Sequence, residues 1–259
     1  MFRFMPICNG FLAVVLCLLP LIVYSDEPPA VAAASSTQAA LEEIATQFHD
    51  DTGKTVRLSF GSSGNIYRQI IQGAPFELFF SADETYVRQL AEADRTAAEA
   101  LYATGRIVLF APLGAPFDVD EQGSDLKTAL ADGRIQRFAI ANPAHAPYGR
   151  AAQEVLQSLS LWEAIKTKLV LGENVSQAAQ FATSGSTQGG IFAYSLALTP
   201  NVSKQGKFVL LPEHLHQPLR QHMTLLKNAG ATAQAFYRYV QQPKARAVFD
   251  RYGFILPDA

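Results

Sequence analysis

Short apolar runs alternate with longer amphipathic segments along the chain after residue 29. The small-residue run 30–34 suits a buried strand, and apolar or β-branched residues at alternate positions predict another strand over 55–60. Between them, apolar residues recur at helical spacing and predict a helix over 38–50. The pattern continues with a helix that ends at Gly73, a strand over 78–80 and a helix that Asp83 caps. This β-α-β-α-β-α order predicts a parallel sheet with helices on both faces.

The same alternation continues to the C-terminus. The expected strands are 106–111, 138–141, 208–211 and 222–226. The expected helices are 126–130, 151–165, 176–183, 232–241 and one from Pro243 to near Gly253, while 190–194 is read as a strand or the approach to a helix. No internal repeat or long linker interrupts the pattern, so any domain boundary has to follow from topology.

The N-terminus differs from the rest of the chain. Residues 1–25 contain one cation, Arg3, and an apolar run from Phe11 to Val23 that is followed at once by a polar chain. This pattern is typical of a secretory signal peptide, and an uncleaved membrane anchor is the alternative. Both cysteines, Cys8 and Cys17, lie inside this segment, so we expect an exported mature protein without cysteine or lipid anchor.

Composition and charge narrow the class of partner. Hydrophobic residues make up 49% of the 259 residues and charged residues 17%, which is an ordinary globular balance. Without residues 1–25 the chain has 20 basic and 23 acidic residues, a net charge of −3. A mildly acidic chain without a basic stripe is a poor nucleic-acid binder. An anion site in it has to rely on local donors rather than on the overall field.

Two strand-to-helix turns carry the same arrangement of serines. Ser35 and Ser36 follow the strand 30–34, and Ser62 and Ser63 follow the strand 55–60. The first N–H groups of a helix are unpaired and lie at its positive end, so a nearby hydroxyl completes an anion cradle. Taken alone, each serine is better explained as a cap of its own helix. Two such turns at the ends of neighbouring strands favour a shared ligand.

Three later segments offer further donors. Asn142–Arg150 ends a strand and opens a helix, with two prolines and Gly149 to fix its backbone; an ordered loop is the alternative. Val175 stands before another helix, where its N–H is free to point outward. Tyr194 follows an apolar strand and carries a hydroxyl donor, although a core tyrosine is the default interpretation.

Several short words occur in the order found in one known family. They are Ala32-Ala33-Ala34-Ser35, Ile44-Ala45-Thr46-Gln47-Phe48, Ser59-Phe60-Gly61-Ser62-Ser63, Arg68-Gln69-Ile70, Gly73-Ala74-Pro75, Ser81-Ala82-Asp83, Asn142-Pro143, His145 with Pro147, Gly190-Ile191 with Tyr194, and Arg251-Tyr252-Gly253-Phe254. With these words the chain resembles the periplasmic molybdate-binding proteins of bacterial ABC transporters, over essentially all of its mature length. Gly64 departs from the pattern, because a hydroxyl residue is often found there.

The resemblance implies an α/β fold of the type II periplasmic-binding-protein architecture. It has two lobes, each a mixed, mainly parallel sheet flanked by helices, joined by a two-segment hinge. We expect a signal peptide at 1–25, lobe I at 26–105 plus 220–259, and lobe II at 106–219. The protein is then periplasmic and monomeric, and a membrane permease is its partner.

The resemblance also implies a ligand site built from neutral donors, without catalytic residues or a cofactor. Ser35 and Ser63 match the hydroxyl donors after the first two strands. Tyr148 matches a position that binds through its backbone, Val175 matches a backbone donor, and Tyr194 matches a hydroxyl donor.

A neutral site suits a tetrahedral dianion. Molybdate, tungstate and sulfate present only acceptors near neutral pH, whereas phosphate keeps a proton and favours an acidic partner. None of the five matched positions is acidic, which disfavours phosphate. The resemblance makes molybdate the expected ligand, with tungstate a second one by its similar size. Sulfate or thiosulfate remains the alternative within this class.

Other classes of function are less well supported by the sequence. A hydrolase would need organised catalytic groups, and 61–64 has the wrong spacing for a nucleophile elbow, with His145 and Asp83 the only further candidates. A metal carrier could use the group Glu213, His214, His216 and His222, which is otherwise a solvated surface. A ligand-sensing regulator would need a DNA-binding module and would have no export signal.

Overall fold

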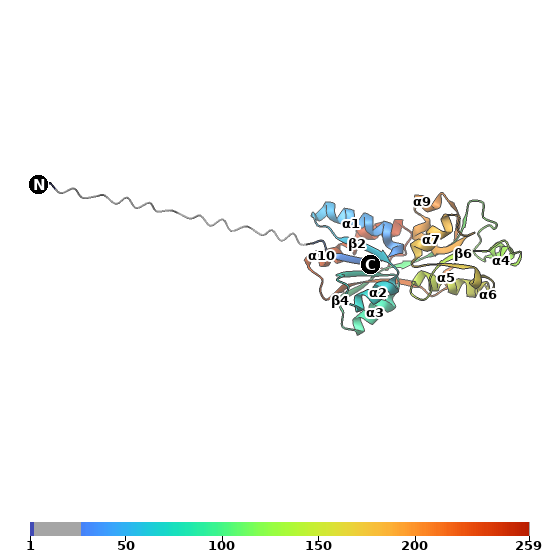
Figure 1. The fold of residues 1–259 in the computed structure, drawn as a ribbon, viewed down its shortest axis with the longest axis horizontal. Helices are drawn as coiled ribbons and strands as arrows, with labels where there is room; N and C mark the ends of the chain where they lie inside the picture. Colours follow the sequence, from blue (N-terminus) through green and yellow to red (C-terminus); the bar gives the residue numbers. More distant parts are fainter. Residues whose placement is uncertain (3–26, 259) are drawn as a thin grey trace.

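The computed structural model describes residues 1–2 and 27–258. The predicted signal peptide therefore lies almost entirely outside the described residues, together with both cysteines. Figure 1 shows two lobes side by side along the long axis of the molecule. Within residues 27–258, none of the helices combines the length and the apolar character that crossing a bilayer requires.

The first lobe is built on a five-stranded sheet with the order β2-β1-β3-β10-β4. β1 pairs in parallel with β2 and β3, whereas β10 runs antiparallel to β3 and β4. Its strands are β1 (Ala30–Ala34), β2 (Arg57–Gly61), β3 (Leu78–Ser81), β4 (Thr96–Gly105) and β10 (Leu219–Leu226). Its helices are the 3₁₀ turn η1 (Ser35–Thr37), α1 (Gln38–Thr52), α2 (Ser63–Ile71), α3 (Glu84–Glu92), α10 (Ala231–Val240) and α11 (Pro243–Arg251).

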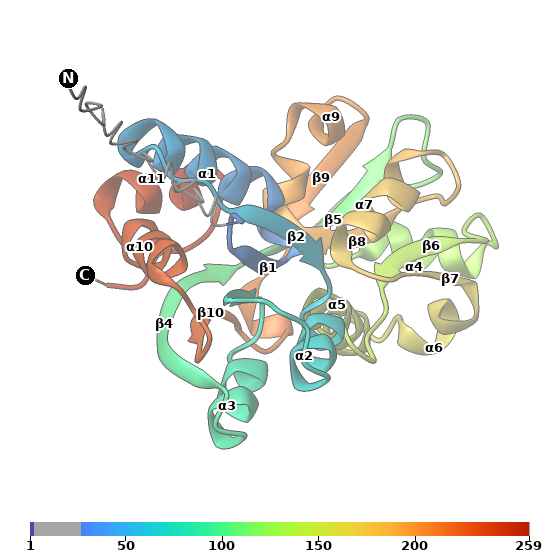
Figure 2. The same cartoon turned by 60° about the vertical axis from the view of Figure 1, so that its left-hand side comes forward.

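Helices cover both faces of this sheet. Successive residues of β3 therefore enter different cores, because side chains alternate along a strand. Leu78 and Phe80 pack in the core that holds α1, α10 and α11, whereas Phe79 packs with α2 and α3. Figure 2 shows the same arrangement, with α1 and α11 on one side of the strands and α2 and α3 on the other. Because β1 is parallel to β2 and β3, the carboxyl ends of these three strands lie together at one edge of the sheet.

The second lobe is built on another five-stranded sheet, with the order β7-β6-β8-β5-β9. β6 is parallel to β7 and β8, whereas β5 is antiparallel to β8 and β9. Its strands are β5 (Ile107–Pro112), β6 (Phe138–Ala141), β7 (Leu169–Gly172), β8 (Gly190–Ala193) and β9 (Gly206–Leu210). Its helices are α4 (Ser124–Ala131), α5 (Pro147–Ser158), α6 (Trp162–Ile165), η2 (Lys166–Lys168), α7 (Val175–Thr183), α8 (Tyr194–Ala197), α9 (Pro200–Ser203) and η3 (Glu213–Leu215).

Two mixed sheets flanked by helices confirm the predicted fold class. In the part of the chain that the structure describes, each sheet has as many antiparallel as parallel pairings, so parallel pairs do not predominate. The antiparallel pairs arise where the chain changes sheet. It leaves the first sheet between β4 and β5 and returns through η3 between β9 and β10.

The structure differs from the expected elements in one long helix and two strands, and it adds short helical turns such as α9 and η3. The helix expected over 151–165 is two helices, α5 and α6, because Ser160 between them adopts the left-handed conformation (φ 57°). The strands β4 and β7 were not expected. The sequence of β4 is rich in alanine and lacks a clear alternation, and its pairing with β10 supplies what the local pattern does not.

Candidate functional site

A small cavity lies where strand ends of the first lobe meet helix starts of the second. Its volume is about 10 Å³, which is about the space that one water molecule needs. The residues that line it are Ala34, Ser35, Gly61, Ser62, Ser63, Ala82, Ala146, Pro147, Tyr148 and Val175. Four of the five residues that the resemblance matched to ligand donors are in this set, although they come from four separate segments of the chain.

Ser35 connects the two lobes at this cavity. It follows β1 directly, and its Oγ donates to Asn174 Oδ1 over 3.2 Å and accepts the N–H of Ser176 over 3.3 Å. Asn174 also caps α7 by accepting the N–H of Gln177 over 3.0 Å. Val175 is the first residue of α7, so its N–H is one of the helix's unpaired donors. The hydroxyl of Ser35 therefore lies beside the positive end of a helix from the other lobe.

Ser63 is the first residue of α2 and is fully buried. Its Oγ accepts the N–H of Ala82 over 2.9 Å, which ties the β2–α2 turn to the end of β3. A hydroxyl that accepts one hydrogen bond keeps its own hydrogen for donation. This bond thus fixes the position of the Ser63 hydroxyl and leaves its proton available on the cavity side.

Tyr148 is the second residue of α5, after Pro147 at the first-turn position that proline favours. Its hydroxyl accepts a hydrogen bond from Gln221 Nε2 over 2.8 Å. Burial raises the pKa of the Tyr148 hydroxyl far above its ordinary value, so the group stays neutral. Tyr148 lines the cavity, and its backbone N–H lies in the first turn of α5, where N–H groups have no partner within the helix.

Tyr194 does not line this cavity. It begins α8 directly after β8, its N–H bonds the carbonyl of Arg106, and its ring packs 6.0 Å from the ring of Phe208. The ring also lies against Gly253 near the C-terminus. The ring of Tyr194 is therefore packed between Phe208 and the C-terminal turn, and Tyr194 is not among the residues that line the cavity.

A contact not expected from the sequence closes one side of the cavity. Ser62 Oγ and His145 Nδ1 lie 2.9 Å apart, and the carbonyl of His145 accepts the N–H of Gly64 over 3.0 Å. His145 Nε2 is 3.6 Å from a carboxylate oxygen of Glu173. Both Ser62 and His145 were part of words that carried the resemblance, but nothing in their spacing placed them together. The serine and the histidine belong to different lobes, so their contact depends on how the lobes meet.

The hydrolase alternative gains little from this group. Asp83, its other candidate, pairs with Arg150 instead of His145. Glu173, which lies near His145, has an exposed side chain, so the group lacks the buried carboxylate that holds a catalytic histidine. The metal-carrier alternative is not supported by geometry either, because the described residues contain no cluster of three or more histidine, cysteine or acidic side chains.

The surroundings of the cavity are electrically neutral. Among the described residues that line it, only Tyr148 has an ionisable side chain, and burial keeps that side chain protonated. The available polar groups are serine hydroxyls and the N–H groups at the starts of three helices, α2, α5 and α7. Such a set satisfies an ion that only accepts hydrogen bonds, and it leaves a ligand that must donate without a partner.

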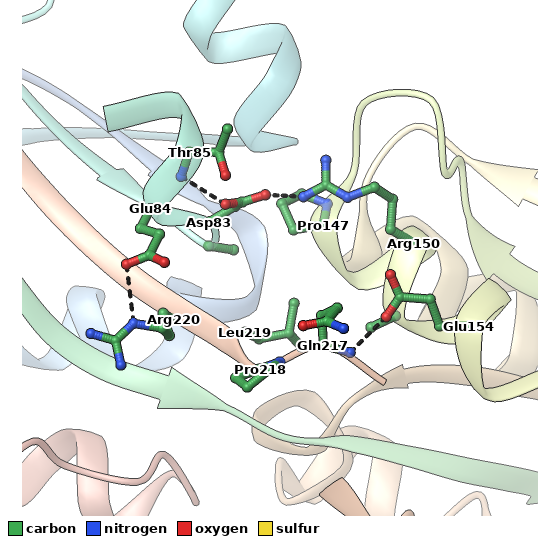
Figure 3. Close-up of a pocket in the computed structure, with 12 residues that line it drawn as sticks. Asp83, Glu84, Thr85, Pro147, Arg150, Glu154, Gln217, Pro218, Leu219 and Arg220 are labelled. Carbon is green, nitrogen blue, oxygen red and sulfur yellow. Dashed lines mark hydrogen bonds and ion pairs between the residues drawn. The ribbon is translucent and has the colours of Figure 1, made fainter. Parts of the chain in front are cut away.

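A larger groove lies beside the cavity, with a volume of about 470 Å³, and shares Ala82 and Pro147 with it. Figure 3 shows two pairs of oppositely charged side chains that face each other, whereas the carboxylate of Glu154 faces Gln217. Arg150 pairs with Asp83, and Arg220 Nε lies 3.0 Å from Glu84 Oε2. Because both guanidinium groups are already neutralised by carboxylates, this groove suits an anion less well than the smaller cavity does.

Two α/β lobes joined by two chain crossings, with a polar cavity where they meet, define the class of two-lobed solute-binding proteins. Residues 29–255 match the model of the family described as bacterial extracellular solute-binding protein, and the chain belongs to this family. It is 37% identical to the molybdate-binding protein ModA of Rhodobacter capsulatus, over 92% of this chain and 91% of that protein. It is 39% identical to ModA of Azotobacter vinelandii, over 86% and 88%.

The fold agrees with a solved relative. The periplasmic molybdate-binding protein of Azotobacter vinelandii superposes with a TM-score of 0.81 at 32% identity, and the match covers 89% of this chain and all of that one. The family resemblance noted in the sequence is therefore confirmed. These relatives are named as binding proteins rather than enzymes.

Proposed function

We propose that this protein captures molybdate in the cavity between its lobes and delivers it to the membrane permease of an ABC transporter. The observation that carries the proposal is the convergence of Ser35, Ser63, Tyr148 and Val175 on one cavity without a charged side chain. The names of the most similar relatives point to the same ligand.

The proposed donors differ in kind. Ser35 and Ser63 donate through their hydroxyls, whereas Tyr148 and Val175 donate through backbone N–H groups at the starts of α5 and α7. The positive ends of these two helices stabilise an anion without a formal countercharge. Tyr194 is not included, because its ring is held elsewhere.

The proposed donors come from both lobes, so ligand binding favours the closed arrangement. We take lobe I as 26–105 plus 220–259 and lobe II as 106–219, with the two crossings as the hinge. A cavity with room for about one water molecule is too small for a tetrahedral oxyanion. The lobes therefore have to move apart by a small amount when the ligand enters, and the site then adjusts around it.

The remaining parts of the proposal concern the cell. The apolar segment before residue 26 directs export, the mature protein works as a monomer in the periplasm, and the permease receives the ligand there. Tungstate binds as well, because its charge and size are close to those of molybdate. Sulfate is the competing ligand within the same class.

Titration calorimetry on the mature protein, dialysed free of anions, tests the ligand. We expect one-to-one binding of molybdate and tungstate with little heat from sulfate or phosphate. Preference for sulfate would keep the neutral site and replace the ligand. No binding of any of the four anions would refute the oxyanion proposal.

A further inference from the structure

A buried chain of hydrogen bonds leads from the cavity to the crossings between the lobes. Gln221 Nε2 donates to the hydroxyl oxygen of Tyr148 over 2.8 Å, and the hydroxyl of Tyr102 donates to Gln221 Oε1 over 2.8 Å. The side chains of all three residues are almost completely buried, with Gln221 at 0% exposure. Both polar ends of the Gln221 amide are thus hydrogen-bonded, as a buried amide requires, and each end binds a tyrosine hydroxyl.

This chain passes through both strands that connect the sheets. Gln221 lies near the start of β10, where the chain returns to the first sheet, and Tyr102 lies near the end of β4, where the chain leaves it. Tyr148 belongs to α5 of the other lobe. The three residues therefore join the two lobes across the two crossings, and relative movement of the lobes changes the distances along this chain.

Gly105 leaves room for these bonds at the first crossing. A Cβ atom on this residue would stand 2.5 Å from Gln221 Nε2 and even closer to the hydroxyl of Tyr148. Such distances do not occur between non-bonded atoms, so any other residue there would displace the Tyr148–Gln221 pair. The space that a side chain of Gly105 would fill is thus occupied by the Tyr148 ring of the other lobe.

We infer that Gln221 is a positioning residue for the oxyanion site, because it anchors the Tyr148 ring at the crossings and so holds the backbone N–H of Tyr148 toward the cavity. The inference rests on the proposed function. Gln221 itself is not among the residues that line the cavity, so its effect reaches the ligand through Tyr148. Tyr102 acts one step further away, by binding the other end of the Gln221 amide.

Four variants and a matched control test this role by calorimetric titration with molybdate. Gln221→Met removes both hydrogen-bonding ends of the side chain at similar size. Tyr148→Phe removes the shared hydroxyl but keeps the backbone donor. The double variant completes a double-mutant cycle. We expect Gln221→Met to weaken binding about fivefold, the effect of one typical hydrogen bond. In the Tyr148→Phe background the same change is expected to weaken binding by less than about twofold, because the bond is already lost.

Thr224→Val is the control. Thr224 is also fully buried in β10, and its Oγ1 donates to the carbonyl of Ala98 over 2.9 Å, within the first sheet and outside the cavity. It should lower the melting temperature, as Gln221→Met also should, and leave molybdate affinity within about twofold. Tyr102→Phe is the second route if Gln221→Met does not fold, and it is expected to weaken binding about two- to fivefold.

Three results would overturn the inference. The first is an unchanged molybdate affinity of Gln221→Met or, if that variant does not fold, of Tyr102→Phe. The second is an equal loss of affinity from Gln221→Met with and without the Tyr148 hydroxyl. The third is a loss of affinity in Thr224→Val as large as that in Gln221→Met. Failure of the unchanged protein to bind molybdate is a separate result, because it rejects the proposed function before any variant is compared.

Discussion

The two sides of the proposed site use different chemistry. The first lobe offers side-chain hydroxyls, Ser35 and Ser63, at the ends of neighbouring strand-to-helix turns. The second lobe offers backbone N–H groups at Tyr148 and Val175, at the starts of two helices. A hydroxyl can rotate about its C–O bond and so can exchange one hydrogen-bond partner for another. The direction of a backbone N–H is fixed by the helix to which it belongs.

Ser35 illustrates the difference. Its hydroxyl donates to Asn174 of the opposite lobe, so donation to an anion has to replace this hydrogen bond. The N–H groups of the second lobe need no such exchange, because Pro147 and the Asn174 cap hold the helix starts in place. The comparison suggests that the second lobe supplies a preformed half-site and that the first lobe completes it on closure. Substitutions that remove one kind of donor at a time test this view.

The largest effect is expected from Ser63→Ala. The change removes a hydroxyl donor to a dianion and leaves the N–H of Ala82 without its buried acceptor. We expect molybdate affinity to fall about 10- to 100-fold in calorimetric titration. Ser81→Ala is the matched control, since Ser81 is equally buried in the same lobe, bonds the carbonyl of Asp83 and does not line the cavity. Equal losses in both variants would mean that Ser63 acts through stability alone.

Two substitutions at Val175 separate the backbone donor from the side chain. Proline is tolerated at the first position of a helix, and the extended conformation of Asn174 suits the residue before a proline. Val175→Pro therefore removes the N–H while α7 is kept, and we expect a loss of affinity of about tenfold or more. Val175→Ala keeps the N–H and should change affinity less than about threefold. Similar affinities of the two variants, measured by the same titration, would contradict a backbone donor here.

A smaller loss is expected from Gly64→Ala, which acts on closure rather than on a donor. A Cβ on Gly64 would stand 2.6 Å from the carbonyl oxygen of His145 in the other lobe, and backbone there cannot move aside cheaply. Overpacking of this kind costs about 1–3 kcal/mol, so we expect affinity to fall about fivefold or more. Small-angle scattering should show a less compact protein with ligand. Gly230→Ala, where a Cβ meets only a carboxylate oxygen at 3.4 Å, is the control that should leave both measurements unchanged.

Much of the fold followed from local patterns in the sequence. The strands and helices of residues 30–92 were predicted closely, because apolar periodicity and turn residues agree there. The strand β4 was missed because its pairing with β10, across more than a hundred residues of sequence, supplies order that its alanine-rich pattern does not. Local propensity carries no information about such distant partners.

The site was predictable only where a motif fixes the backbone. Ser35, Ser63, Tyr148 and Val175 all stand at strand-to-helix turns, and these four lie together in the structure. The contact of Ser62 with His145 and the role inferred for Gln221 had no signal in the sequence, because each depends on how the two lobes meet. Tyr194 follows β8 directly and does not line the cavity, so its expected role as a hydroxyl donor stays a prediction.

The smallest effect is therefore expected at Tyr194. Its ring packs against Phe208 and Gly253, and Tyr194 is not among the residues that line the cavity. Tyr194→Phe keeps this packing and removes only the hydroxyl, and we expect molybdate affinity to change by less than about twofold. A loss comparable to that of Ser63→Ala would mean that the tyrosine turns toward the ligand on binding. The second lobe would then contribute a side-chain hydroxyl as well, and the division between the two halves of the site would not hold.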